Sequence, residues 1–198
     1  MHFLCLANRL DFHKLALAML SNCRSISTWI FTFGLGEETG WRGFLLPRLQ
    51  GKYSALTSSL IVGIIWAGWH SPMFLYNENL RAHGPTGTIF WVIGLMFGAT
   101  FLTWLYNSSR GSILMTALWH GTYNLFTGAA GQAAGLFAGI ISMFVMVWVI
   151  LIVTIFKPRD LSHSEKQTVT RRADRIIKTV RSSTQEESGN ALLPLHLR

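Results

Sequence analysis

The sequence predicts an all-α fold, a bundle of about five membrane-spanning helices that enclose a polar cavity within the membrane. Half of the 198 residues are hydrophobic and only 13% are charged, whereas soluble domains carry ~25% charged residues. The 103 residues of the stretch 54–156 include only three charged side chains. Because this leaves too little polar surface to cover a water-soluble globule, we expect an integral membrane protein, located in the cell membrane.

The apolar stretches give the order of the elements. Residues 1–24 contain only one short apolar stretch, 15–20, which is too brief to cross ~30 Å of hydrocarbon. We interpret this segment as interfacial, or as the remnant of an upstream helix. A first span is predicted over 25–49. Four further stretches have the length of a span and few charges: 54–76, 87–106, 112–130 and 133–156. The transmembrane core is therefore predicted over 25–156.

The charge distribution predicts a basic tail over 157–198. Nine of the 17 Lys and Arg residues lie there, and the net charge is +8. Positive charge next to membrane spans is typical of cytoplasmic segments, so we expect a cytoplasmic C-terminus, anionic lipid as the partner of the tail, and no nucleic acid. Residues 166–181 suit a surface helix, and disorder is expected from Ser182 onward. Alternation of the spans places the turns at 50–53 and 107–111 on the side of the tail.

Small residues predict where the spans approach one another. Glycines recur every four residues at 131, 135 and 139, and again at 94 and 98, a spacing that permits close helix packing in membranes. The two cysteines, Cys5 and Cys23, have no metal-type spacing and form no disulfide framework.

Three charged residues interrupt the first predicted span. Glu37, Glu38 and Arg42 lie inside it, where an ionised side chain costs ~2.5–3.5 kcal/mol unless it is paired or hydrated. Glu38 and Arg42 are four residues apart and share a helix face, so they can form an ion pair. Glu37 points ~100° away and stays available. The alternative is a buried ion pair that serves only packing or topology.

Other spans contribute polar groups at a similar depth. His70 lies in the second span, and His120 and Asn124 are four residues apart in the fourth. This set is suited to hydrolysis: Glu37 would deprotonate a water molecule, His70 would position that water or carry the proton, and His120 with Asn124 would donate to an oxyanion. The same groups allow a zinc site with Glu37, His70 and His120 as ligands, although no H-E-x-x-H motif is present.

The three motifs resemble those of the CPBP family, the CAAX-type and bacteriocin-processing intramembrane proteases. The segments 37–43, 66–70 and 120–124 are similar to its E-E-x-x-x-R, aromatic-x-x-x-H and H-x-x-x-N motifs, with Trp66 where Phe is commoner. The resemblance implies an intramembrane endopeptidase related to the type II Ras-converting CAAX endopeptidases. It further implies that Glu37 and His70 activate water, that His120 and Asn124 form the oxyanion site, and that Glu38 and Arg42 support them. The implied substrate is a membrane-embedded or lipid-anchored protein or peptide. We expect no cofactor, with zinc as the alternative.

Two functions of other classes are weighed against an enzyme. The first is a non-catalytic bacteriocin-immunity or scaffold protein that binds a partner through the same cavity. The second is a small transporter or proton relay, since membrane-buried Glu and His also serve ion paths. All six motif residues are present, which favours the enzyme, and no inverted repeat is visible, which disfavours the transporter.

Overall fold

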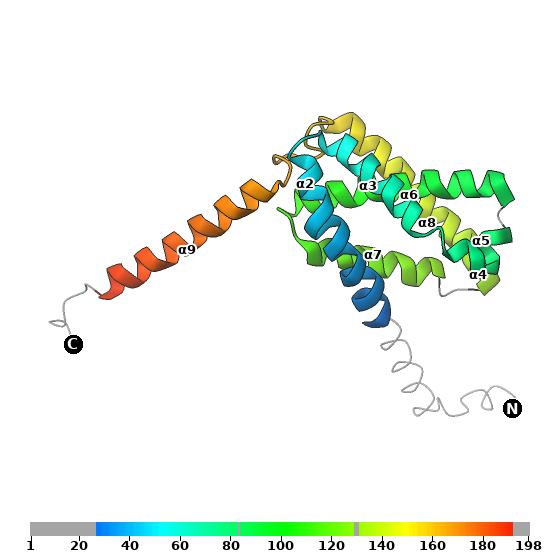
Figure 1. Cartoon of the computed structure of the whole chain (residues 1–198), viewed down its shortest axis with the longest axis horizontal. Helices are drawn as coiled ribbons and strands as arrows, with labels where there is room; N and C mark the ends of the chain where they lie inside the picture. Colours follow the sequence, from blue (N-terminus) through cyan, green and yellow to red (C-terminus); the bar gives the residue numbers. More distant parts are fainter. Residues whose placement is uncertain (1–26, 83, 129–130, 192–198) are drawn as a thin grey trace, which may run out of the picture.

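The computed structural model is all-helical over the residues that it describes, 27–82, 84–128 and 131–191 (Figure 1). The helices are η1 (Trp29–Glu37), η2 (Thr39–Leu45), α2 (Leu46–Gln50), α3 (Ala55–Trp69), α4 (Met73–Tyr76), α5 (Glu78–Ala82), α6 (Gly84–Ser108), α7 (Ile113–Gly128), α8 (Gly131–Ile155) and α9 (Val169–Ala191). The predicted fold class is therefore confirmed. The interpretation of residues 1–24 falls outside the described residues.

Each of the five predicted spans lies on helical segments, with two differences from the prediction. The first span is wound mostly as a π-helix, in η1 and η2, and continues as an α-helix in α2. The second span does not run unbroken to residue 76, because α3 ends at Trp69 and a turn at His70 and Ser71 precedes α4. Pro72 follows that turn, and the residue before a proline is disfavoured in an α-helix.

Length and apolar composition alone qualify two described segments to cross a membrane, Ala55–Tyr76 and Gly84–Ser108, while the apolar stretch Gly139–Ile155 is shorter. Only 28% of each window is buried inside the protein. Large apolar side chains face outward on several helices, among them Ile64 (60% exposed), Phe90 (69%) and Phe144 (70%). Water would not favour so much exposed apolar surface, whereas lipid would.

Helix packing brings α7 against η1, α3 against α6, and α6 against α8 (Figure 1). Two glycines permit the contact between η1 and α7. A Cβ on Gly34 would lie 2.5 Å from the carbonyl oxygen of Ala117, and one on Gly121 would lie 2.8 Å from the Cα of Ile30. The backbones can approach this closely only where no side chain intervenes.

The glycines that the four-residue spacing singled out do not mediate close contacts in the described part of the chain. A Cβ added to Gly94 or Gly139 would meet no described atom within 4 Å, and one on Gly98 would make an ordinary contact at 3.8 Å. That prediction was wrong for these three positions, because regular spacing along one helix does not tell which face meets a neighbour.

The loops 50–54, 108–112 and 156–168 meet at one end of the bundle, as alternation of the spans predicts. Gln50 and Asn107 are fully buried there and exchange two side-chain hydrogen bonds of 3.1 and 2.8 Å. The segment after α8 closes this end: the Gln50 amide donates to the Gln167 carbonyl at 2.9 Å, and the Asn107 amide donates to the Asp160 carbonyl at 2.9 Å. Leu161 is also fully buried. Residues 157–168 thus belong to the packed body, and the predicted boundary at 157 lies too early for a tail.

Helix α9 projects from this end of the bundle (Figure 1). It continues to Ala191, so the expectation of disorder from Ser182 was wrong over 182–191. Gln185, Glu186 and Glu187 have good helix propensity, and the only glycine, Gly189, falls near the end of the helix.

Candidate active site

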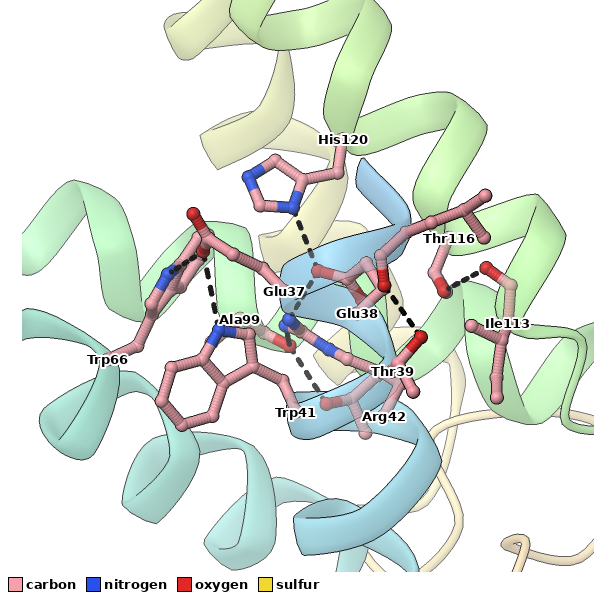
Figure 2. Close-up of polar contacts among 12 residues, drawn as sticks. Glu37, Glu38, Thr39, Trp41, Arg42, Trp66, Ala99, Ile113, Thr116 and His120 are labelled. Atoms are coloured by element: carbon pink, nitrogen blue, oxygen red, sulfur yellow. Dashed lines mark hydrogen bonds and ion pairs between the residues drawn. The ribbon is translucent and has the colours of Figure 1, made fainter. Parts of the chain in front are cut away.

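Glu38 forms the buried electrostatic centre of the site. Its side chain is completely buried, as is that of Arg42. Oε1 of Glu38 accepts hydrogen bonds from Arg42 Nη1 at 2.8 Å and from Nδ1 of His120 at 2.9 Å (Figure 2). Arg42 also donates from Nη2 to the carbonyl oxygen of Ala99 at 3.3 Å. The four-residue spacing therefore produces the predicted ion pair, and the structure adds His120 from α7 to it.

Two polar atoms of this centre have no hydrogen-bond partner among the described residues, Glu38 Oε2 and Arg42 Nε. In a carboxylate and a guanidinium that are buried so completely, each of these atoms would normally have a hydrogen-bond partner.

Glu37 lies beside this centre with a different set of partners. Its Oε2 accepts hydrogen bonds from two indole N–H groups, that of Trp66 at 2.7 Å and that of Trp41 at 3.3 Å (Figure 2). Its Oε1 accepts none from the residues that the structure describes. The carboxylate is partly exposed. The prediction that Glu37 points away from the Glu38–Arg42 pair is thus met in part, because Glu37 is held by neutral donors while one oxygen is left over.

The winding of the first span explains how two consecutive glutamates reach different surroundings. Glu37 is the last residue of η1, and Glu38 lies between η1 and η2. The N–H of Glu38 bonds to the carbonyls of Gly34 and Leu35, so the backbone tightens there between two wider π-helical turns. π-Helical turns are found frequently at functional sites.

His70 lies at the C-terminal end of α3, not within an unbroken span. Its Nδ1 is 2.8 Å from the carbonyl oxygen of Trp66, and because a carbonyl only accepts, Nδ1 carries the proton. The ring packs edge-on against Trp66 and Trp91, at centroid distances of 5.7 and 5.6 Å. Trp66 therefore lies between His70 and Glu37, and among the described contacts none joins those two side chains directly.

His120 and Asn124 are one turn apart on α7. His120 is 3% exposed, and its ring packs edge-on against Trp66 with centroids 5.2 Å apart. With Nδ1 directed at Glu38, Nε2 remains for another partner. Asn124 is half-buried and makes no side-chain hydrogen bond to the residues that the structure describes. The structure thus joins Glu37, Glu38, Arg42, His70 and His120 through contacts, and leaves Asn124 beside them without one.

The alternative of a zinc site was tested on the donor geometry. Among the described residues, no group of three or more His, Cys, Asp or Glu side chains is placed to hold a metal ion. The hydrogen bonds to Glu37 and His120 occupy Oε2 and Nδ1 and leave Oε1 and Nε2 over. The described residues therefore form no preassembled zinc site, and zinc stays the alternative to a metal-free site.

The sequence analysis missed the two tryptophans as hydrogen-bond donors. The motif marks Trp66 only as its aromatic position, and it gives Trp41 no role. A signal was present, because the indole N–H of a tryptophan buried in a membrane protein needs an acceptor, and the first span carries a carboxylate without a cationic partner.

Fold and site together define a helical membrane protein with a buried Glu–Arg–His centre next to a partly accessible glutamate. A family model described as "Type II CAAX prenyl endopeptidase Rce1-like" matches residues 20–126 of the chain. The chain belongs to this family.

One curated relative gives a more specific comparison. The chain is 33% identical over 95 residues to a protein named CAAX prenyl protease 2 from Methanococcus maripaludis, a match that covers 45% of this chain and 34% of that protein. The chain thus spans about a third of the length of the relative it matches. No solved structure matches the chain.

Proposed function

We propose that the protein is an intramembrane endopeptidase that hydrolyses peptide bonds of membrane-associated proteins or peptides. The observation that carries the proposal is the asymmetry of Glu37: Oε2 is held by two indoles, while Oε1 accepts no hydrogen bond from the described residues. A carboxylate that is anchored through one oxygen can accept a proton from water through the other. Family membership supports this interpretation.

In the proposed mechanism, Glu37 deprotonates a water molecule, and Nε2 of His70 accepts a hydrogen bond from that water or takes up its proton. The hydroxide attacks the scissile carbonyl carbon, and the resulting oxyanion receives hydrogen bonds from His120 Nε2 and the Asn124 amide. Since Nδ1 of His120 already donates to Glu38, the ring donates from Nε2 only when both of its nitrogens carry a proton, and the Glu38 carboxylate then faces both Arg42 and His120. Collapse of the intermediate expels the amine, which takes up the proton that the water lost, from Glu37 or, where His70 has carried that proton, from His70.

The substrate class follows from the setting. The site lies among helices that expose apolar surface, which supports a substrate that reaches it from the membrane. Both names found in the comparisons refer to prenylated CAAX sequences. We therefore propose a lipid-anchored C-terminal peptide as substrate, in the cell membrane, with the C-terminus of the protease in the cytoplasm and no cofactor.

The decisive variant is Glu37→Gln. The purified protein, reconstituted in liposomes, is given a farnesylated CAAX peptide and the same peptide without the prenyl group, and the products are followed by mass spectrometry. The proposal expects cleavage of the prenylated peptide, its loss in Glu37→Gln, and its retention in the matched control Glu78→Gln, whose carboxylate is exposed in α5. Cleavage retained in Glu37→Gln contradicts the mechanism, and binding without cleavage by the unsubstituted protein favours the scaffold function.

Metal dependence is tested separately. Activity that persists after purification in chelator, with less than one zinc per hundred protein molecules by elemental analysis, supports the metal-free mechanism. Activity that follows added zinc contradicts it.

We also propose that α9 binds anionic lipid. Ile176, Ile177 and Val180 are about 60% exposed on this helix, and Arg171, Arg172, Arg175, Lys178 and Arg181 accompany them. Such a helix is suited to the boundary of an anionic bilayer. A spin label at Ile177 should lose water accessibility in nanodiscs that contain phosphatidylglycerol but not in pure phosphatidylcholine; equal accessibility in both would contradict the assignment.

A further inference from the structure

Trp66 contacts four of the six motif side chains. Its indole N–H donates to Glu37 Oε2 at 2.7 Å, and its carbonyl accepts from His70 Nδ1 at 2.8 Å. The ring lies 5.2 Å from the ring of His120, and the guanidinium carbon of Arg42 lies 5.5 Å from its centroid. With 5% of its surface exposed, Trp66 is fixed by packing.

We propose that Trp66 is a positioning residue that holds Glu37 and His70 in one fixed relation for attack by water. This inference rests on the proposed function. The side chain of Trp66 orients the carboxylate, and its backbone sets which nitrogen of His70 carries the proton. Trp66 thereby orients both of the groups that must act on the same water molecule. A phenylalanine would fill much of the same volume but would leave Oε2 of Glu37 without this donor.

Trp41 also donates to Glu37, but it cannot position Glu37 relative to His70. Its hydrogen bond is longer, 3.3 Å, and its ring is only half-buried. Trp41 also lies four residues from Glu37 on the same span, so its hydrogen bond holds the carboxylate only relative to its own helix. Trp66 lies 29 residues away on α3, the helix that ends at His70. Only the Trp66 hydrogen bond therefore fixes the position of the carboxylate relative to the imidazole.

The sharpest test replaces Trp66 by 3-benzothienylalanine, which keeps the shape of tryptophan and exchanges the N–H group for sulfur. A hydrogen bond to a charged group corresponds to roughly ten- to a hundredfold in an equilibrium constant, so we expect kcat on the membrane peptide to fall by about tenfold or more. KM should change less than twofold, since the ring still fills its place. Trp66→Phe should lower kcat similarly, and Trp41→Phe should lower it less. Unchanged kcat with the benzothienyl side chain would overturn the proposal.

A second comparison separates positioning from packing. In Glu37→Asp, the shorter carboxylate cannot keep the same hydrogen bond to the indole, so replacing the N–H of Trp66 should lower the residual kcat of this variant by less than twofold. An equal loss of kcat in the Glu37→Asp variant and in the protein with its native glutamate would mean that Trp66 acts elsewhere and would overturn the proposal.

The role of Glu37 and the role of Trp66 can be distinguished by experiment. Cleavage that survives Glu37→Gln removes the proposed mechanism and this inference with it. Cleavage that needs Glu37 but is indifferent to the indole N–H leaves the proposed function intact and removes only the role of Trp66.

Discussion

Replacing Glu38 by Gln tests the buried centre on which the site is built. The change keeps the size of the side chain and an acceptor oxygen but removes the charge that faces Arg42 at 2.8 Å. Both side chains are completely buried, and the remaining described acceptor of the guanidinium is the Ala99 carbonyl at 3.3 Å. Removing one partner of a buried ion pair costs about 3–5 kcal/mol, because the other charge stays buried without compensation. We expect a loss of that size in the free energy of unfolding.

The assay is unfolding of the reconstituted protein in mixed micelles by increasing SDS, followed by circular dichroism. Glu78→Gln is the matched control, because Glu78 faces Arg81 at 3.8 Å with side chains 90% and 54% exposed, and such exposed pairs add little. The double variant Glu38→Gln/Arg42→Met should be more stable than Glu38→Gln alone, because it removes the uncompensated charge. The reasoning is refuted if Glu38→Gln shifts the transition no further than the control, or if the double variant is the less stable one.

Two further changes test how the helices are held around the site. Gly34→Ala and Gly121→Ala should each lower both stability and peptide cleavage, since the added Cβ would come within 2.5 and 2.8 Å of backbone on the neighbouring helix. Gly40→Ala is the control, because no described atom lies within 4 Å of its added Cβ. Equal stability and cleavage in all three variants would contradict the packing of η1 against α7. Gln50→Leu should remove the two hydrogen bonds that Gln50 exchanges with the buried Asn107 side chain and cost about 1–3 kcal/mol in the same SDS assay. Gln50→Leu/Asn107→Leu should recover part of that loss, and no recovery would show that the two amides are not coupled.

The fold class and the ion pair could be predicted from the sequence because both depend on local regularities. Apolar stretches of span length predict helices wherever they lie, and a four-residue spacing places Glu38 next to Arg42 whatever the partners of the helix. The meeting of the loops 50–54, 108–112 and 156–168 at one end of the bundle could also be predicted, because successive spans alternate in direction. These features need no knowledge of which helix faces which.

The features that could not be predicted depend on the faces that meet. The spacing of Gly34 and Gly121 is not distinctive, yet these two residues bring η1 against α7 and so place His120 on Glu38. Gln50 and Asn107 lie at the ends of their helices, where polar residues attract no notice, although they are fully buried against the segment after α8. Regular spacing predicts which residues share a helix face, whereas tertiary packing determines which of those residues contact a neighbouring helix.

Under the proposed mechanism, the two adjacent carboxylates Glu37 and Glu38 have different tasks. Glu38 is completely buried and paired with Arg42 and His120, so its carboxylate is not accessible to an external molecule. Glu37 is partly exposed and held by indoles, which orient a carboxylate without neutralising its charge. A cation in the place of Trp66 would instead have paired with the Glu37 carboxylate and neutralised its charge. A neutral donor across the helix interface therefore meets both demands that the proposed mechanism places on Glu37, a fixed position and an available charge.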